Sequence, residues 1–215
     1  MQGYCQVQRD YLARKLNGLG PQAGITAVSI GLLYYEPEIL AIPAGWVGRA
    51  PANGSWNRYA HAYTELNRLL DETCSQLVEK FGGVAEQATV GGFIGQVKHA
   101  NDYFPVAVSH RAFAEAARMG WRGRHGLIVT PEAGPALRLA TVFIPQGLRR
   151  HHKNLPGCGD CEACLQVCPI LRQGKGYREK CRQRIKALGL RAEVCGICVR
   201  VCWEALRNSR PRKPT

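Results

Sequence analysis

Hydrophobic positions in the N-terminal part of the chain follow first a helical and then a strand-like pattern. Residues 7–17 carry apolar side chains at helical spacing and are followed by Gly18, Gly20 and Pro21, so we expect a short helix that ends there. Residues 25–35 (ITAVSIGLLYY) are a β-branched apolar run. This run predicts a buried strand in a sheet that is covered on both faces.

The longest predicted helix covers residues 57–81. Apolar side chains recur there at intervals of three, four and seven residues, and Gly82 and Gly83 end the pattern. Cys74 lies inside this helix, and we expect it to be a small core residue. The preceding residues 37–56 are rich in Pro, Gly and Ala without periodicity, which predicts a long loop.

Further elements are expected between residues 111 and 144. Residues 111–119 should form a short helix, and residues 126–129 and 139–144 should form two strands joined by the turn TPEAGP. Helical and strand segments alternate along the chain. The predicted fold class is therefore α+β, with an α/β sandwich as the main architecture.

The 215 residues, 46% of them hydrophobic, suffice for one ordinary domain and a small appendage. We expect an α/β domain over residues 1–150 and a cysteine-rich domain over residues 151–215. No apolar run is long enough to cross a bilayer, and no cleavable leader is evident in MQGYCQVQRDYLARK. These features predict a soluble, cytoplasmic protein.

Eight of the ten cysteines lie between residues 158 and 202. The stretch GCGDCEACLQVCP has the spacing C-x2-C-x2-C-x3-C followed by Pro169, which resembles the cluster-binding run of bacterial ferredoxins. In two-cluster ferredoxins the cysteine before that proline binds the other 4Fe-4S cluster, so a second set of cysteines should follow. The remaining four are Cys181, Cys195, Cys198 and Cys202.

Exchange of the outer cysteines between the two sets gives two groups of four predicted ligands. The first cysteine group is Cys158, Cys161, Cys164 and Cys202. The second cysteine group is Cys168, Cys181, Cys195 and Cys198. Two features depart from the ferredoxin pattern: thirteen residues separate Cys181 from Cys195 instead of two, and Trp203 follows Cys202 where proline is usual.

Zinc ribbons and disulfides are the alternative interpretations of the same cysteines. Four thiolates in two C-x2-C steps can bind zinc, whereas a disulfide framework is typical of short secreted chains. Cys5 and Cys74 have no partner spacing and belong to neither group. His151 and His152 could be metal ligands, but next to Arg and Lys in the polar connector RRHHKNLP such histidines are more often solvated side chains.

The formal charge of +13 is concentrated near the C-terminus. Residues 149–215 contain 16 Lys and Arg against 5 Asp and Glu, a net of +11, whereas residues 1–148 contribute only +2. Such a basic region can attract a polyanion such as tRNA, or an acidic electron-transfer partner. It can also compensate the negative charge of thiolate-bound clusters.

The stretch MGWRGRHGLIVTPEAGPALRLATVFI, a connector and the cysteine run together resemble the epoxyqueuosine reductase family and related cobalamin-dependent reductases, whose members are longer. The family motif G-x-G-W-x-G-[KR]-x-x-L-hydrophobic-x-P-x-x-G precedes two 4Fe-4S clusters. Matching positions here are Gly120, Trp121, Gly123, Arg124, Leu127, Pro131 and Gly134. The likeness extends more weakly to RYAHAYTELNRLLDE.

The resemblance implies a nitroreductase-like α/β domain that binds cobalamin, a two-cluster ferredoxin-like domain, and a role in tRNA modification. A ferredoxin or flavodoxin is the implied electron donor. Gly120, Trp121, Gly123 and Arg124 would belong to the cofactor-binding segment, with Arg124 contacting corrin side chains or a substrate phosphate. Trp121 is also interpreted as packing against the sheet.

The resemblance also implies a catalytic acid. The family shows Asp, two residues and then Pro-Val, and the matching carboxylate is Asp102 in DYFPV. A general acid needs a raised pKa, which apolar neighbours can provide. The alternative is that Asp102 caps a turn. His110 is a candidate proton donor or polar contact, or else a helix N-terminal or core residue.

Three functional hypotheses follow. The first is a cobalamin-dependent reductase in which the clusters carry electrons and Asp102 gives the proton. The second is an electron-transfer subunit that docks to a partner enzyme and has no catalytic cofactor of its own. The third is tRNA binding without catalysis.

Overall fold

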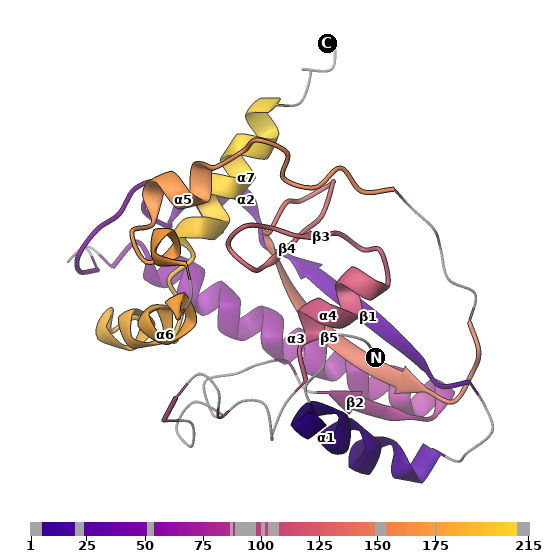
Figure 1. Cartoon of the computed structure of the whole chain (residues 1–215). Coiled ribbons are helices and arrows are strands. Elements are labelled where there is room, and N and C mark those ends of the chain that lie inside the picture. The colour runs from indigo at the N-terminus through magenta and orange to yellow at the C-terminus, as the bar shows by residue number, and fades with distance from the viewer. Residues whose placement is uncertain are drawn as a thin grey trace. The chain divides into compact units, whose positions relative to one another are not determined.

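The computed structural model describes residues 6–19, 24–50, 54–86, 88, 98–99, 102, 108–148, 154–174 and 176–209. Helices and strands are mixed along these residues, which confirms the α+β class (Figure 1). The helical elements are α1 (Gln6–Leu16), η1 (Asn17–Leu19), α2 (Glu36–Leu40), α3 (Asn57–Phe81), α4 (His110–Ala116), α5 (Ala163–Val167), η4 (Leu171–Gln173), α6 (Tyr177–Ala187) and α7 (Ile197–Ser209). The strands are β1 (Thr26–Leu33), β2 (Val84–Glu86), β3 (Trp121–Arg122), β4 (Ile128–Val129) and β5 (Leu137–Ile144).

The chain folds as two compact units that are each assembled from separate segments. The first unit comprises residues 1–32, 65–119 and 138–154, and the second comprises residues 33–64, 120–137 and 155–215. The division into functional domains at residue 150 stays a prediction, because these units group segments by packing alone. No helix in the described part of the chain is long and apolar enough to cross a membrane.

A three-stranded sheet with the order β1-β5-β2 forms the centre of the first unit (Figure 1). β2 runs antiparallel to β5, and Glu86 stands opposite Thr141. Side chains alternate between the two faces of a strand. Ala140, Val142 and Ile144 therefore project from one face of β5, and Thr141 and Phe143 project from the other.

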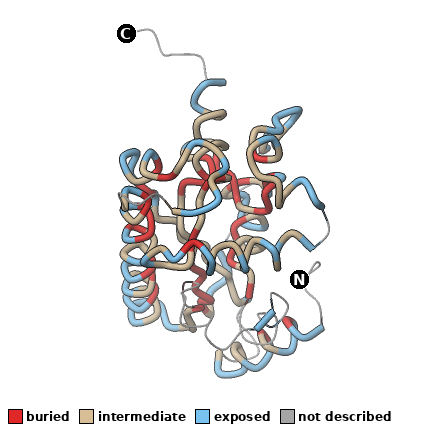
Figure 2. The backbone as a smooth tube through the Cα atoms, turned by 90° about the vertical axis from the view of Figure 1, so that its left-hand side faces the viewer, coloured by how far each residue is buried: buried red, intermediate tan, exposed pale blue. Residues whose placement is uncertain are grey.

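The two faces of this sheet carry two separate apolar cores. On one face Leu70 and Cys74 of α3 pack with Ala140 and Val142. On the other face Leu12 of α1 packs with Val108 and Phe143, and the ring of Phe113 in α4 meets that of Phe143 edge to face at 5.2 Å. The first unit is therefore a helix–sheet–helix sandwich. Along the helices in Figure 2, inward positions are buried and outward positions are exposed.

Three predicted elements differ from the structure. β1 was expected to be buried on both faces, but its residues are only partly buried, because β1 lies at the edge of a small sheet. The predicted loop 37–56 differs at its start, where the structure has the short helix α2. Pro37 lies in the first turn of α2, where backbone N–H groups have no partner within the helix, so proline loses no hydrogen bond there. The strand predicted at 126–129 is reduced to β4, which pairs with β3. The helix predicted at 57–81 is confirmed as α3.

The second unit consists of the β3-β4 hairpin and the helices of the cysteine-rich region. α5 and α7 pack against each other (Figure 1). The hairpin is so tight that a Cβ atom on Gly120 would lie 2.3 Å from the Val129 carbonyl oxygen. Gly196, just before α7, also permits close packing. Its φ is +79°, and a Cβ atom there would lie 2.6 Å from the Tyr59 ring.

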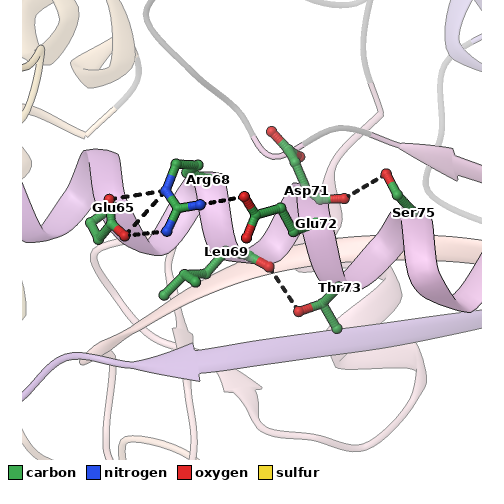
Figure 3. A network of polar contacts seen from close by, with 7 residues as sticks. All are labelled: Glu65, Arg68, Leu69, Asp71, Glu72, Thr73 and Ser75. Carbon is green, nitrogen blue, oxygen red and sulfur yellow. Dashed lines mark hydrogen bonds and ion pairs between the residues drawn. The ribbon is translucent and has the colours of Figure 1, made fainter.

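An exposed charge network follows one face of α3 (Figure 3). Arg68 forms ion pairs with Glu65, three residues before it, and with Glu72, four residues after it. Thr73 and Ser75 donate hydrogen bonds to backbone carbonyls one turn earlier. These contacts are local to the helix and solvent-screened, so they contribute little to the stability of the unit.

Glu86 is the one charged side chain among the described residues that is buried in the first unit, with 4% of its surface exposed. Lys15 of α1 pairs with its carboxylate at 2.6 Å, and the Tyr11 hydroxyl donates to the same carboxylate at 3.1–3.2 Å. The backbone N–H of Val108 also points to it at 3.4 Å. Burial, together with the Glu86 charge, raises the pKa of Tyr11. This contact fixes α1 to the edge of the sheet.

Replacing Glu86 by alanine should destabilise the protein by about 3 kcal/mol, because the partly buried Lys15 ammonium and Tyr11 hydroxyl lose their partner. Urea unfolding followed by circular dichroism measures the change. Glu72→Ala, which removes an exposed ion pair from α3, is the control and should leave the midpoint unchanged. Equal effects of the two substitutions would contradict this account.

The Cys74 thiol gives a pH-dependent prediction. Burial, with a smaller effect of the Asp71 charge, raises its pKa from the ordinary value of 9.0 to about 11. The unfolded chain therefore loses this proton first as the pH rises. The stability advantage of the native protein over Cys74→Ala should be complete below pH 9 and should shrink by about 2 kcal/mol towards pH 11. Urea unfolding of both proteins at pH 8 and pH 10.5 tests this; a constant difference would refute it.

Candidate functional site

Short helices and tight turns of the second unit position the eight clustered cysteines. Cys164 lies on α5, Cys181 on α6, and Cys198 and Cys202 on α7. Cys202 follows Cys198 by four residues and so lies one helical turn further along the same face. The pairing of α5 with α7 brings the start of the cysteine run near its end.

The thiols of the first cysteine group influence one another. Burial, together with negative charge on Cys164, Cys158 and Cys161, raises the pKa of Cys202 to about 12. The pKa of Cys164 is also raised, by burial first and then by Cys158 and Cys161. Cys202 thus lies beside the three cysteines of the distant ferredoxin-like run.

The thiols of the second cysteine group behave in the same way. Burial, together with negative charge on Cys195 and Cys168, raises the pKa of Cys181 to about 11. The pKa of Cys198 is raised strongly by burial, then by Cys195, Cys181 and Cys168, and last by Cys164. The structure therefore brings together the same two groups of thiols that the interleaved spacing predicts. Their role as cluster ligands stays a prediction.

The cysteines of the described region are all free thiols. Within that region no three His, Cys, Asp or Glu side chains are grouped as ligands of a single metal ion. The thiols nevertheless lie near enough for each group to raise the pKa values of its own members. Cys74 lies in the apolar core of the first unit, which confirms its interpretation as a core residue.

Arg124 holds the loop of the first cysteine group. Its Nε donates to the Cys161 carbonyl at 3.1 Å and its Nη2 donates to the Gly159 carbonyl at 3.0 Å. Within the loop the Cys161 N–H donates to the Cys158 carbonyl at 3.1 Å. The guanidinium fork therefore ties the β3-β4 hairpin to the turn between the first two cysteines.

A second anchor holds the turn before α7. The indole Nε1 of Trp56 donates to the Cys195 carbonyl at 2.7 Å, and Trp56 is fully buried. The next residue, Gly196, packs against Tyr59 and Ile42 with no room for a side chain. The turn that leads into α7 is thus fixed immediately before Ile197, where the helix begins.

Arg184 of α6 lies beside the second cysteine group. A hydrogen bond from its side chain lowers the pKa of Cys195, against the larger effect of burial, which raises it. Its Nη2 also donates to the Val47 carbonyl at 2.5 Å, and its guanidinium carbon lies 3.7 Å from the centre of the Trp46 ring. A partly exposed indole is therefore linked through one side chain to a cysteine thiol.

The residues predicted to contact a corrinoid are mostly engaged within the chain. Gly120 accommodates the Val129 carbonyl, and a Cβ atom on Gly123 would lie 2.7 Å from the His125 ring. Arg124 holds the cysteine loop as described above. In Trp121 the indole Nε1 is buried and has no hydrogen-bond partner within the described residues, so it remains available for a polar contact.

His110 and Asp102 both belong to the first unit. His110 is the first residue of α4, is buried, and its Nδ1 lies 3.0 Å from the Thr141 hydroxyl oxygen. The Asp102 carboxylate is exposed and accepts the N–H groups of Lys98 and His99 at 2.9 and 2.7 Å, as a turn-capping residue does. Tyr103, Phe104 and Pro105, the expected apolar neighbours, lie outside the described residues, as do His151 and His152.

Four residues that support the cysteines could not be found from sequence patterns. These are Trp46, Trp56, Arg184 and Gly196, of which only Gly196 stands inside a C-x2-C step. The other three act through contacts with residues far away in the sequence. Arg124 was singled out for a different contact, a corrin side chain or phosphate, whereas here it binds two carbonyls of the cysteine loop.

Known proteins resemble this chain over part of its length. The curated epoxyqueuosine reductase of Salmonella typhimurium is 34% identical over 143 residues, which cover 66% of this chain and 35% of that protein. The one from Pseudomonas aeruginosa is 30% identical over 141 residues, covering 64% of this chain and 36% of the relative. The chain is a relative of the epoxyqueuosine reductases. It spans about a third of the length of these curated relatives.

Among solved structures, the epoxyqueuosine reductase from Streptococcus thermophilus aligns with 95% of this chain and 54% of its own, at 17% identity and a TM-score of 0.48. No protein-family model matches the sequence.

The Arg124 contacts predict a measurable effect on the cysteine loop. Arg124→Lys keeps the charge but cannot donate to both carbonyls, so deuterium uptake in a peptide covering residues 157–162 should rise severalfold. Hydrogen exchange followed by mass spectrometry gives this readout. Arg122→Lys, on the exposed side of the same hairpin, should leave the uptake unchanged. An unaltered loop in Arg124→Lys would show that the two hydrogen bonds do not hold it.

Proposed function

We propose that this chain is an iron-sulfur reductase of the queuosine pathway, and that its two cysteine groups each hold a 4Fe-4S cluster. The observation that carries the proposal is the pairing of Cys202 with the ferredoxin-like run and of Cys168 with the downstream cysteines. The relationship to epoxyqueuosine reductases supports the pathway and the oxidoreductase class.

The donor sets suit such clusters. A 4Fe-4S cluster has an iron atom at each of four corners, so its four thiolates bind different metal atoms and stand farther apart than the ligands of a single ion. Each group here supplies four thiols and no other ligand type. Burial disfavours free thiolates at Cys198 and Cys202, and iron binding would remove that cost by taking the thiolate as a ligand.

Residues around the groups would hold the ligands in place before a cluster binds. Arg124 fixes the turn between Cys158 and Cys161, and Trp56 fixes the turn that starts at Cys195. The Arg184 hydrogen bond to the Cys195 thiol directs positive charge towards the second group. Such contacts to ligand sulfurs and ligand backbones are the means by which proteins tune these centres.

When bound, the clusters would supply one-electron transfer at low potential, and a corrinoid would supply a strongly nucleophilic reduced cobalt. On the protein side, Trp121 is the residue of the predicted cofactor segment that retains an unused buried donor. Asp102 is proposed to give the proton to the leaving oxygen of the substrate, a modified base of tRNA, and its exposed carboxylate is accessible for that purpose.

A second candidate function is electron transfer to a partner enzyme without a corrinoid. It is favoured by one observation: Gly120, Gly123 and Arg124 are engaged in packing or in holding the cysteine loop, and His110 is buried against Thr141. Under this alternative the first unit is a docking platform and Asp102 only caps its turn.

Anaerobic purification followed by iron, sulfide and cobalt analysis tests both candidates. The proposed reductase should contain about eight iron and eight sulfide per chain, as expected for two cubane clusters, together with bound corrinoid. Iron and sulfide without corrinoid would favour the electron-transfer protein. Zinc in place of iron would overturn both.

Cysteine substitutions test the interleaved assignment. Cys161→Ala and Cys202→Ala should each remove the same cluster, and Cys168→Ala should remove the other, so that each variant retains about half of the iron expected for two clusters. Paramagnetic resonance of the reduced proteins identifies the cluster that remains. Cys74→Ala is the control and should retain all of the iron. Loss of the same cluster in Cys202→Ala and Cys198→Ala would indicate ligation without exchange.

Replacing Asp102 by asparagine separates the two candidate functions. The substitution should leave cluster content and reduction by dithionite unchanged, because Asp102 lies outside the cysteine groups. If Asp102 is the general acid, turnover of epoxyqueuosine-containing tRNA should fall about 100-fold or more. Undiminished turnover would remove Asp102 from the chemistry.

A further inference from the structure

Two stretches of the cysteine-rich region carry opposite charge. Residues 171–191, which include Cys181 of the second group, contain eight Lys and Arg against one Glu, a net of +7. Residues 157–168, which carry three cysteines of the first group and Cys168 of the second, contain Asp160 and Glu162 and no basic residue, a net of −2. A charged partner is therefore drawn to the stretch around Cys181 and repelled from the stretch 157–168, or the reverse.

The basic side chains of this stretch point outwards. The exposed ones in the described region are Arg172, Arg178, Lys180, Lys186 and Arg191. The one acidic residue, Glu179, is neutralised by Arg182 of the next helical turn at 2.7 Å. We call these five side chains, together with Trp46, the basic face.

Part of the basic face lies on α6, the helix that carries Cys181 of the second cysteine group. Cys181 is partly buried, whereas Lys186, five residues further on and therefore on the opposite side of the helix, is exposed. One helix diameter, about 10 Å, separates these surfaces. An electron can tunnel over such a distance fast enough for turnover.

Trp46 adds an apolar contact to this charged surface. Its side chain is 38% exposed, and the Arg184 guanidinium that covers one ring face also hydrogen-bonds the Cys195 thiol. An aromatic contact ringed by charged side chains is the composition of a small protein–protein interface. Interfaces of electron carriers are among the smallest and most charge-dependent of these.

We propose that the basic face docks an acidic one-electron carrier protein and that electrons enter the chain at the second cysteine group. This inference rests on the proposed function, because it requires a cluster in that group. In the transfer step the carrier loses one electron and the cluster gains one, and no bond is made or broken.

RNA is the other polyanion that such a face can attract. Single-stranded RNA binds basic surfaces by stacking its bases on exposed aromatic rings. Arg184 already covers one face of the Trp46 ring at 3.7 Å, so only the other face is open to a base. The concentration of charge over one cysteine group also favours a redox partner.

The test compares reduction of the full reconstituted chain by two agents under anaerobic conditions. Dithionite reports whether the clusters accept electrons at all, and a reduced acidic plant-type ferredoxin reports docking. The variant Arg178→Glu/Lys186→Glu reverses two exposed charges of the basic face. Its matched control, Arg9→Glu/Lys80→Glu, reverses two exposed charges of the first unit and has the same net charge.

At low ionic strength the Arg178→Glu/Lys186→Glu variant should be reduced by ferredoxin at least about tenfold more slowly than the control. The extent of reduction by dithionite should be the same in both. Raising the salt concentration should slow the reduction of the native protein by ferredoxin. It should also narrow the difference in reduction rate between the two variants. The single variant Lys186→Glu should show a smaller effect in the same direction.

Three results would oppose the proposals, and they are distinguishable. Absence of iron, or no reduction by dithionite, would defeat the proposed function itself. Full reduction by dithionite with equal ferredoxin rates in variant and control would overturn the docking inference alone. Equal ferredoxin rates with a loss of tRNA binding in a filter assay would assign the basic face to nucleic acid and likewise overturn the inference.

Discussion

The packing of α5 against α7 is the constraint on which the candidate site depends. Neither end of the cysteine-rich region has four suitably placed thiols by itself, because Cys202 is needed beside the first run and Cys168 beside the later one. The two helices must therefore meet before either group is complete. Their contact is supported from outside by Arg124 on one loop and Trp56 on the other. If the groups bind clusters as proposed, cofactor binding and folding of this unit are coupled.

The two units use different means of stabilisation. The first has apolar cores on both faces of a sheet, and its only described buried charge, Glu86, is compensated by Lys15 and Tyr11. The second has many glycines with positive φ, and its interior holds buried apolar side chains such as Trp56, Ile42 and Ile197 beside the clustered thiols. If those thiols bind clusters as proposed, the stability of this unit should depend on that binding as well as on its apolar core.

Local sequence patterns predicted the features that depend on local periodicity or spacing. α3 has the predicted bounds because its apolar positions recur regularly and two glycines follow it. The gathering of the eight thiols could be predicted because their spacing repeats a known cluster-binding pattern, and their role as ligands stays a prediction. The position of β1 at a sheet edge could not be predicted, since an apolar β-branched run has the same sequence pattern at the edge and at the centre of a sheet. The role of Arg124 could not be predicted either, because its two acceptors lie 35 and 37 residues away in the sequence.

The influence of Cys164 on Cys198 links the two groups across their boundary. If each group holds a redox centre, a negative charge added to one is felt at the other through a short stretch of low-dielectric interior. The two centres would then not accept electrons independently. The second electron would be taken up at a lower potential than the first. The first electron would therefore tend to leave the protein before a second one is accepted.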